Sequence, residues 1–117
     1  MNDLKPESLL PLPTAVFHIL IALADRDRHD YSIMQDVAAR SGGKVQLSAG
    51  TLYSSIRRML EQGLIEELRE SPEPSSTDER RRYYRLTRFG KRAAAAEVER
   101  LNAMLKQARA TGLVPGA

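Results

Sequence analysis

The stretch LSAGTLYSSIRRMLEQG, residues 47–63, decides the fold. Ser48 is a favoured helix N-cap residue and Gly63 is a common helix stop, so the stretch predicts a helix between them. Its apolar residues recur at helical spacing and predict one buried stripe made of Ala49, Leu52, Ile56, Met59 and Leu60.

The opposite side of this helix carries small and basic residues. With about 100° between neighbours, it holds Gly50, Thr51, Ser54, Arg57 and Arg58, with Tyr53 at its edge. Small residues permit close approach, hydroxyls and first-turn amides can donate to phosphates, and arginine can pair with guanine or phosphate. Glu61 lies on the same side, but no acid stands between Ser48 and Leu60. A solvated face usually mixes acids and bases, so the pattern favours contact with DNA.

Two helices are expected before this stretch. Thr14 is expected to cap the first, and its apolar stripe is Val16, Phe17, Leu20, Ile21 and Ala24. The polar cluster 25–28 ends it. The second helix closes at Gly42-Gly43, and its stripe is Tyr31, Met34, Val37 and Ala38.

Two strands and a long helix are expected after it. Residues 64–69 and 82–86 predict strands, with Tyr84 and Leu86 on one face, and the turn-rich segment 71–78 joins them into a hairpin. Thr87 is expected to cap a final helix from Arg88 to about Ala110. Three helices followed by a hairpin are the winged helix-turn-helix order, a mainly α fold with a small β-hairpin (α+β).

The chain is accordingly divided into four parts. A flexible N-terminal arm (1–12) precedes a winged helix-turn-helix domain (13–87), a C-terminal dimerisation helix (88–111) and a tail (112–117). The last helix carries an apolar seam spaced by four, three, four and three residues: Ala94, Val98, Leu101, Leu105 and Ala108. This heptad-like spacing suits pairing with a second copy, although a helix packed on its own domain produces it too.

Arg80, Arg81 and Arg82 stand at the start of the second strand. In a winged helix they lie near the wing tip, where they can follow the minor groove or the DNA backbone. Acidic residues share this hairpin, so pairing of the arginines with those carboxylates is the alternative.

Composition limits the other functions. The chain has 117 residues, no cysteine and two histidines, which leaves room for about one domain and excludes disulfides and thiolate metal sites. No nucleophile–base pair or phosphate-binding glycine loop stands at a recognisable spacing, so we expect no enzyme, cofactor or metal site. Residues 1–13 do not match a signal peptide and the apolar run 19–24 is too short for a membrane span, so we expect a cytoplasmic protein.

Several motifs together resemble the PadR-type transcriptional regulators. Residues 47–53 and 56–59 resemble the "GTLY" recognition helix of that family, and residues 81–87 with Gly90 resemble its second wing strand and the entry to its dimerisation helix. His29-Asp30-Tyr31 matches the usual His-Gly-Tyr, except that Asp30 replaces glycine. The similarity spans about residues 13–105, and the short C-terminal helix is similar to the compact branch.

The resemblance implies a homodimeric repressor that binds a pseudo-palindromic operator on double-stranded DNA. It implies these DNA-binding residues: Tyr31, Ser48, Thr51, Tyr53, Ser54, Arg57, Arg58, Arg80, Arg81 and Arg82. It also allows for an unidentified small-molecule effector between the C-terminal helices. Residues 92–117 contain no aromatic side chain, so such a pocket would be aliphatic. A winged helix that contacts another protein instead of DNA remains the alternative.

Overall fold

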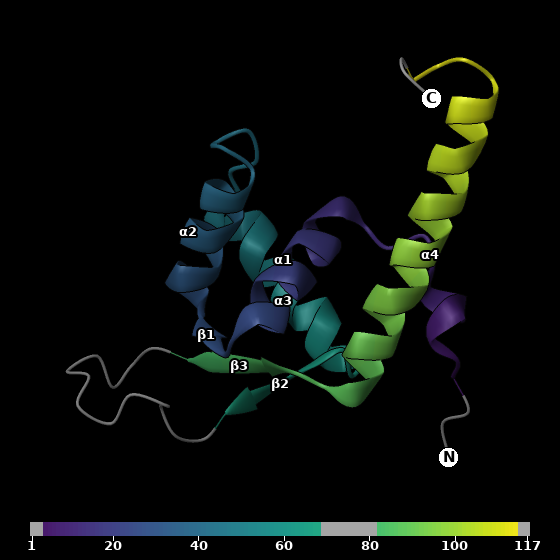
Figure 1. Ribbon diagram of the computed structural model, residues 1–117. Helices are drawn as coiled ribbons and strands as arrows, with labels where there is room; N and C mark the ends of the chain where they lie inside the picture. Colours follow the sequence, from purple (N-terminus) through teal and green to yellow (C-terminus); the bar gives the residue numbers. More distant parts are fainter. Residues whose placement is uncertain (1–3, 69–81, 115–117) are drawn as a thin grey trace.

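The structure is a computed structural model that describes residues 4–68 and 82–114 (Figure 1). The elements within these ranges are η1 (Pro6–Leu9, a 3-10 helix), α1 (Thr14–Asp25), β1 (Arg28–His29), α2 (Asp30–Arg40), α3 (Ala49–Glu61), β2 (Ile65–Leu68), β3 (Tyr83–Leu86) and α4 (Arg88–Ala110). The predicted class, mainly helical with a small antiparallel sheet, is confirmed, and the long final helix has the predicted bounds.

Helix α1 is the centre of the core. It packs against α2, α3, α4 and β3, and it buries Val16, Ile19, Leu20, Ala22 and Leu23. The expected stripe shares only Val16 and Leu20 with this set, and Ile21 is 38% exposed. A single stripe describes a helix covered from one side, whereas α1 is covered from several.

Helix α2 faces the core differently from the prediction. It buries Ile33 and Val37, which lie four residues apart on one face. Tyr31 is 50% exposed because it stands two residues, or about 200°, from Ile33. Of the predicted stripe, Val37 alone is fully buried, while Met34 and Ala38 are half-buried.

Three of the helices have an N-cap residue whose side chain accepts a hydrogen bond from a backbone N–H of the first turn. Ser48 Oγ accepts from the backbone N–H of Thr51 at 3.1 Å, and Thr87 Oγ1 accepts from that of Gly90 at 2.9 Å, as predicted. His29 Nδ1 accepts from the backbone N–H of Ser32 at 3.0 Å and so caps α2. Thr14 is instead the first residue of α1, whose N-cap is Pro13, with no side-chain hydrogen bond.

The sheet contains a strand that the sequence did not indicate. The order is β1-β3-β2 with both pairs antiparallel, so β3 is central. Arg28 pairs with Tyr84, and His29 with Tyr83. Tyr84 and Leu86 are buried as the shared face predicts, and Tyr83 is buried too, with the His29 ring edge-on to it at 5.2 Å. The expected strands 64–69 and 82–86 each begin one residue later, at Ile65 and Tyr83, and residues 69–81, with the expected turn segment 71–78, lie outside the described residues.

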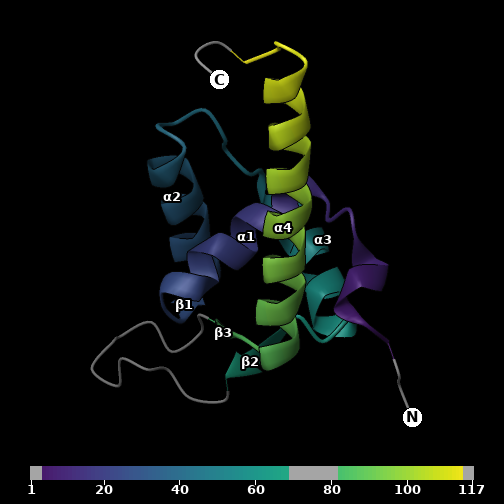
Figure 2. The ribbon, with the colours of Figure 1, turned by 45° about the vertical axis from the view of Figure 1, so that its right-hand side comes forward.

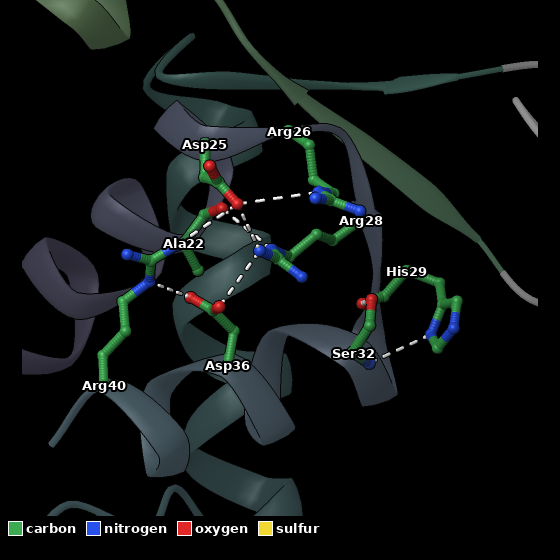
Figure 3. A network of polar contacts seen from close by, with 8 residues as sticks. All are labelled: Ala22, Asp25, Arg26, Arg28, His29, Ser32, Asp36 and Arg40. Atoms are coloured by element: carbon green, nitrogen blue, oxygen red, sulfur yellow. Dashed lines mark hydrogen bonds and ion pairs between the residues drawn. The ribbon is translucent and has the colours of Figure 1, made fainter. Parts of the chain in front are cut away.

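Arg28 joins the end of α1 to the middle of α2 (Figure 3). Its side chain is 14% exposed, Nε donates to the carbonyl oxygen of Ala22 at 2.9 Å, and Nη2 contacts Asp25 at 2.8 Å and Asp36 at 3.0 Å. Arg40 closes the network through the same two carboxylates. The network holds α2, and with it the turn that leads to α3, against α1.

The N-terminal segment packs on α4 (Figure 2), unlike the flexible arm expected for residues 1–12. Pro6 and Leu12 are buried. The backbone N–H of Leu12 approaches Glu97 Oε1 at 3.5 Å, and Arg100 donates to both oxygens of Glu97 at 2.8 and 2.7 Å. Residues 1–3 lie outside the described residues. The N-terminal segment from residue 4 to Leu12 is therefore packed as part of the folded domain.

Glu97 makes this junction sensitive to acid. It is 3% exposed, and the hydrogen bonds from Arg100, helped by the N–H of Leu12 and opposed by burial, hold the pKa of its carboxyl below the ordinary value. A lowered folded pKa gives stability that is fully present above the unfolded pKa of about 4.3 and is lost as pH falls through the folded pKa. We expect Glu97→Gln to lower the free energy of unfolding at pH 7 by about 1–2 kcal/mol.

Urea denaturation at fixed protein concentration measures this effect. The difference in unfolding free energy between wild type and Glu97→Gln should shrink as pH falls below about 4, because Glu97 then loses its charge in wild type. The other carboxyls titrate in both proteins, so their effect cancels in the difference. A difference that stays constant from pH 7 to pH 3 would contradict the role of the Glu97 charge.

Gly90 permits the close approach of α4 to the sheet. A Cβ at this position would overlap the carbonyl oxygen of Leu64 and lie 2.8 Å from Leu86 Cδ1, whereas a Cβ at Gly50 would meet nothing within 4 Å. Gly90→Ala should therefore cost about 1–3 kcal/mol of unfolding free energy. The matched variant Gly50→Ala should be neutral or stabilise by up to about 1 kcal/mol. Thermal denaturation of both variants checks this, and equal melting temperatures would contradict the tight contact.

Candidate nucleic-acid interface

We define the α3 outer face as the residues between positions 50 and 58 that lie away from the buried stripe of α3, while the exposed Glu61 follows on the same side near the C-terminal end of the helix. All of them are exposed in the structure: Gly50, Thr51, Tyr53, Ser54, Arg57 and Arg58. The buried side of α3 consists of Leu52, Ile56 and Met59, while Leu60 is half-buried and Ala49 is exposed. The separation into one buried and one exposed side agrees with the sequence.

The N-terminal turn of α3 holds its hydroxyls in local hydrogen bonds. Besides capping the helix, the Ser48 hydroxyl donates to Thr51 Oγ1 at 3.1 Å. The Ser54 hydroxyl donates to the carbonyl oxygen of Thr51 at 3.2 Å. A phosphate or base that took these donors would have to rotate the hydroxyls away from partners that they already have.

Arg58 lies beside the start of α1. It lines a hollow together with Pro13, Val16, Ser54 and Ser55. Because Pro13 offers no side-chain cap, the first amides of α1 have no acceptor from a capping side chain, and the positive end of the helix dipole lies at this hollow. A guanidinium, two hydroxyls and a helix start are suited to a phosphate oxygen.

Tyr53 lies on the side of the α3 outer face that approaches α2. Its ring is 53% exposed, and its hydroxyl donates to Asp30 Oδ2 at 2.7 Å. The other oxygen, Asp30 Oδ1, accepts from the backbone N–H of Tyr31 at 2.6 Å. The sequence singled out Asp30 only because it replaces the glycine of the family's usual His-Gly-Tyr motif. No local pattern relates residues 23 positions apart, so the sequence did not indicate this contact.

The three wing arginines are described only in part. Arg80 and Arg81 lie outside the described residues. Arg82 is described, with its side chain 71% exposed and Nε 4.0 Å from Glu67 Oε2. Such a long, exposed pair contributes little to stability, so it does not prevent Arg82 from reaching another anion.

The seam of α4 is exposed in the single chain. Val98, Leu101 and Leu105 are 45%, 39% and 40% exposed, and Ala94 and Ala108 are half-buried. Met104, which is not one of the predicted seam residues, is 53% exposed beside them. The C-terminal half of α4 projects from the domain in both ribbon views (Figures 1 and 2). A row of apolar side chains on a projecting helix marks an interaction surface.

The described residues contain no candidate metal site and no membrane-spanning helix. Over residues 4–68 and 82–114, no group of three or more His, Cys, Asp or Glu side chains could hold a metal ion. None of the helices described there is long and apolar enough to cross a membrane.

Comparison with known proteins identifies a family and relatives to which this chain is similar. The model of a family described as "Transcriptional regulator PadR-like family" matches residues 19–96. An uncharacterized protein X of Lysinibacillus sphaericus is 32% identical over 73 residues, which are 62% of this chain. The chain spans 64% of that curated relative, slightly less than two thirds of its length.

Solved structures share the fold. A PadR family transcription regulator from hypervirulent Clostridium difficile has 26% sequence identity and a TM-score of 0.71, with 85% of this chain and 98% of that chain covered. A transcriptional regulator from Clostridium thermocellum has 22% identity and a TM-score of 0.68, with 80% and 85% covered. The second likeness supports the winged-helix fold alone.

Proposed function

This chain belongs to the PadR-like family of transcriptional regulators, and we propose that it is a sequence-specific DNA-binding repressor that acts in the cytoplasm as a homodimer. We assign it no catalytic role. The division into a winged helix-turn-helix domain, residues 13–87, and a dimerisation helix, residues 88–111, is part of this proposal.

One observation carries the proposal: the α3 outer face is exposed and holds small residues and two arginines, with no acid from Ser48 to Leu60. An α-helix fits the major groove of B-DNA, and close entry needs small side chains on the leading face. Gly50 and Ser54 provide them. In a helix turned toward water alone, this absence of acids would have no evident use.

We assign different DNA contacts to the two arginines of α3 because they lie at different positions around the helix. Gly50, Ser54 and Arg57 follow one line along the helix because they are spaced by four and three residues. We assign Arg57 to the edge of a base, guanine being its usual partner. Arg58 lies about 100° away, at the hollow beside the start of α1, and we assign it to a backbone phosphate. Thr51 and Ser48 accompany Arg58, and the arginines at 80–82 are assigned to the adjacent backbone.

A second copy would cover the exposed seam of α4. Apolar residues from Val98 to Leu105 would pair with their symmetry mates in a twofold interface. The two α3 helices would then reach successive major grooves about one DNA turn apart, which requires a pseudo-palindromic operator. Any effector bound between the two α4 helices would meet aliphatic side chains.

Selection of bound sites from a random duplex pool tests the function. We expect an enriched motif with two inverted half-sites whose centres lie about 10 base pairs apart. Enrichment of no motif would contradict a sequence-specific regulator. Together with salt-insensitive or absent duplex binding, it would favour the alternative, a winged helix that contacts another protein.

A further inference from the structure

A carboxylate from another helix stands at the edge of the α3 outer face, which contains no acid of its own between positions 50 and 58. Asp30 comes from the first turn of α2, and its side chain is 22% exposed. Its contacts are the N–H of Tyr31, the hydroxyl of Tyr53 and His29 Nδ1 at 3.8 Å. His29 Nδ1 also accepts a hydrogen bond from the backbone N–H of Ser32 at 3.0 Å. Within the described ranges, no lysine or arginine pairs with Asp30.

The hydrogen bond from Tyr53 to Asp30 decides what this edge can recognise. The Tyr53 hydroxyl donates to Asp30 Oδ2 and orients the carboxylate, whose two oxygens each accept one hydrogen bond and keep further acceptor lone pairs. A DNA phosphate is anionic and accepts only, so this edge repels it. In the major groove, the groups that donate are the exocyclic amines of cytosine and adenine, and a carboxylate is the usual partner of cytosine N4.

We propose that Asp30 and Tyr53 form a specificity-determining pair, in which the Asp30 carboxylate, oriented by the Tyr53 hydroxyl, accepts a hydrogen bond from the exocyclic amine of a base, with cytosine preferred. This inference rests on the proposed function, because it needs α3 in the major groove. Tyr53 lies on the α2 side of the α3 outer face, so the pair contacts a base beside the one that Arg57 contacts. The pair increases the preference for one base and lowers the affinity for duplex DNA of any sequence, whereas Arg58 raises that affinity.

Site selection with three variants tests the pair. Wild type should enrich one cytosine position in each half-site. Asp30→Asn should lose that preference by about 5- to 150-fold or shift it to adenine, the usual partner of asparagine. Its affinity for random duplex at low salt should rise about two- to fivefold, because an anionic group is removed. Tyr53→Phe frees the carboxylate from its tether and should relax the same position.

Glu61→Gln is the matched control. It removes the same charge from the exposed C-terminal end of α3, so it should raise affinity for random duplex and leave the cytosine preference unchanged. Melting temperatures near that of wild type would establish that the variants are folded, and Tyr53→Phe still tests the pair where Asp30→Asn is unstable.

The outcomes are distinguishable. A wild type that enriches a motif, with the same base preferences retained in Asp30→Asn and Tyr53→Phe, would overturn the pair and leave the proposed function intact. A wild type that enriches no motif would overturn the proposed function and this inference with it.

Discussion

Replacing Leu101 and Leu105 together by aspartate should convert the proposed dimer into monomers and weaken operator binding by at least about 100-fold. Both side chains are about 40% exposed on the projecting half of α4. In a paired seam, four carboxylates would be buried without partners, which costs several kcal/mol. Each monomer would then bind a single half-site and lose the gain from bivalent binding, which is about 10²–10⁴-fold.

Sedimentation velocity and fluorescence anisotropy with operator DNA measure the two effects. Ala103 and Gln107 supply the matched control, since they have the same spacing and lie on the opposite side of α4. Replacing both by aspartate adds the same charge to the helix and should leave the dimer intact. A Leu101→Asp/Leu105→Asp protein that still sediments as a dimer would remove the seam from the interface.

The second large effect is expected for Arg57→Ala. If each Arg57 contacts a guanine, its removal costs about 1–3 kcal/mol per half-site. With two half-sites per dimer, the operator affinity should fall by about 30- to 2 × 10⁴-fold, and the preference for guanine should relax at one position of each half-site. Affinity for random duplex should change far less, because base contacts contribute little to it.

Arg92→Ala is the control for this variant. Arg92 is an exposed arginine of α4, so its removal changes the net charge equally without touching the α3 outer face. Titration of operator and random duplex separates the two variants. An equal loss on both DNAs for Arg57→Ala would assign Arg57 to the phosphate backbone and contradict its role in sequence recognition.

Local chemistry explains what the sequence predicted well. The bounds of α4 and the caps at Ser48 and Thr87 depend on residues adjacent in the chain, where propensity and capping act directly. The two-sided character of α3 follows from its own period. The DNA-binding and dimer residues placed on these helices remain predictions, which the variants above test.

What the sequence did not predict depends on contacts between distant residues. β1 is two residues long, too short for a period, and it forms because Arg28 and His29 pair with β3. The face that α2 buries is set by its packing on α1. The N-terminal segment is held by Glu97, a charged residue that a sequence pattern places at the surface, and its burial depends on Arg100 and Leu12. The contact of Asp30 with Tyr53 arises in the same way.

The most direct test of the central claim, that the α3 outer face binds DNA, is the dependence of duplex affinity on salt for wild type and for Arg57→Ala/Arg58→Ala. For wild type, the logarithm of the binding constant should fall linearly with the logarithm of salt concentration, by about 0.9 per phosphate contact. The double variant should bind far more weakly, and the loss of the two Arg58 contacts per dimer should flatten the slope by about 1.8. Wild-type binding that is absent or insensitive to salt would contradict the claim, as would a double variant with the affinity and slope of Arg92→Ala.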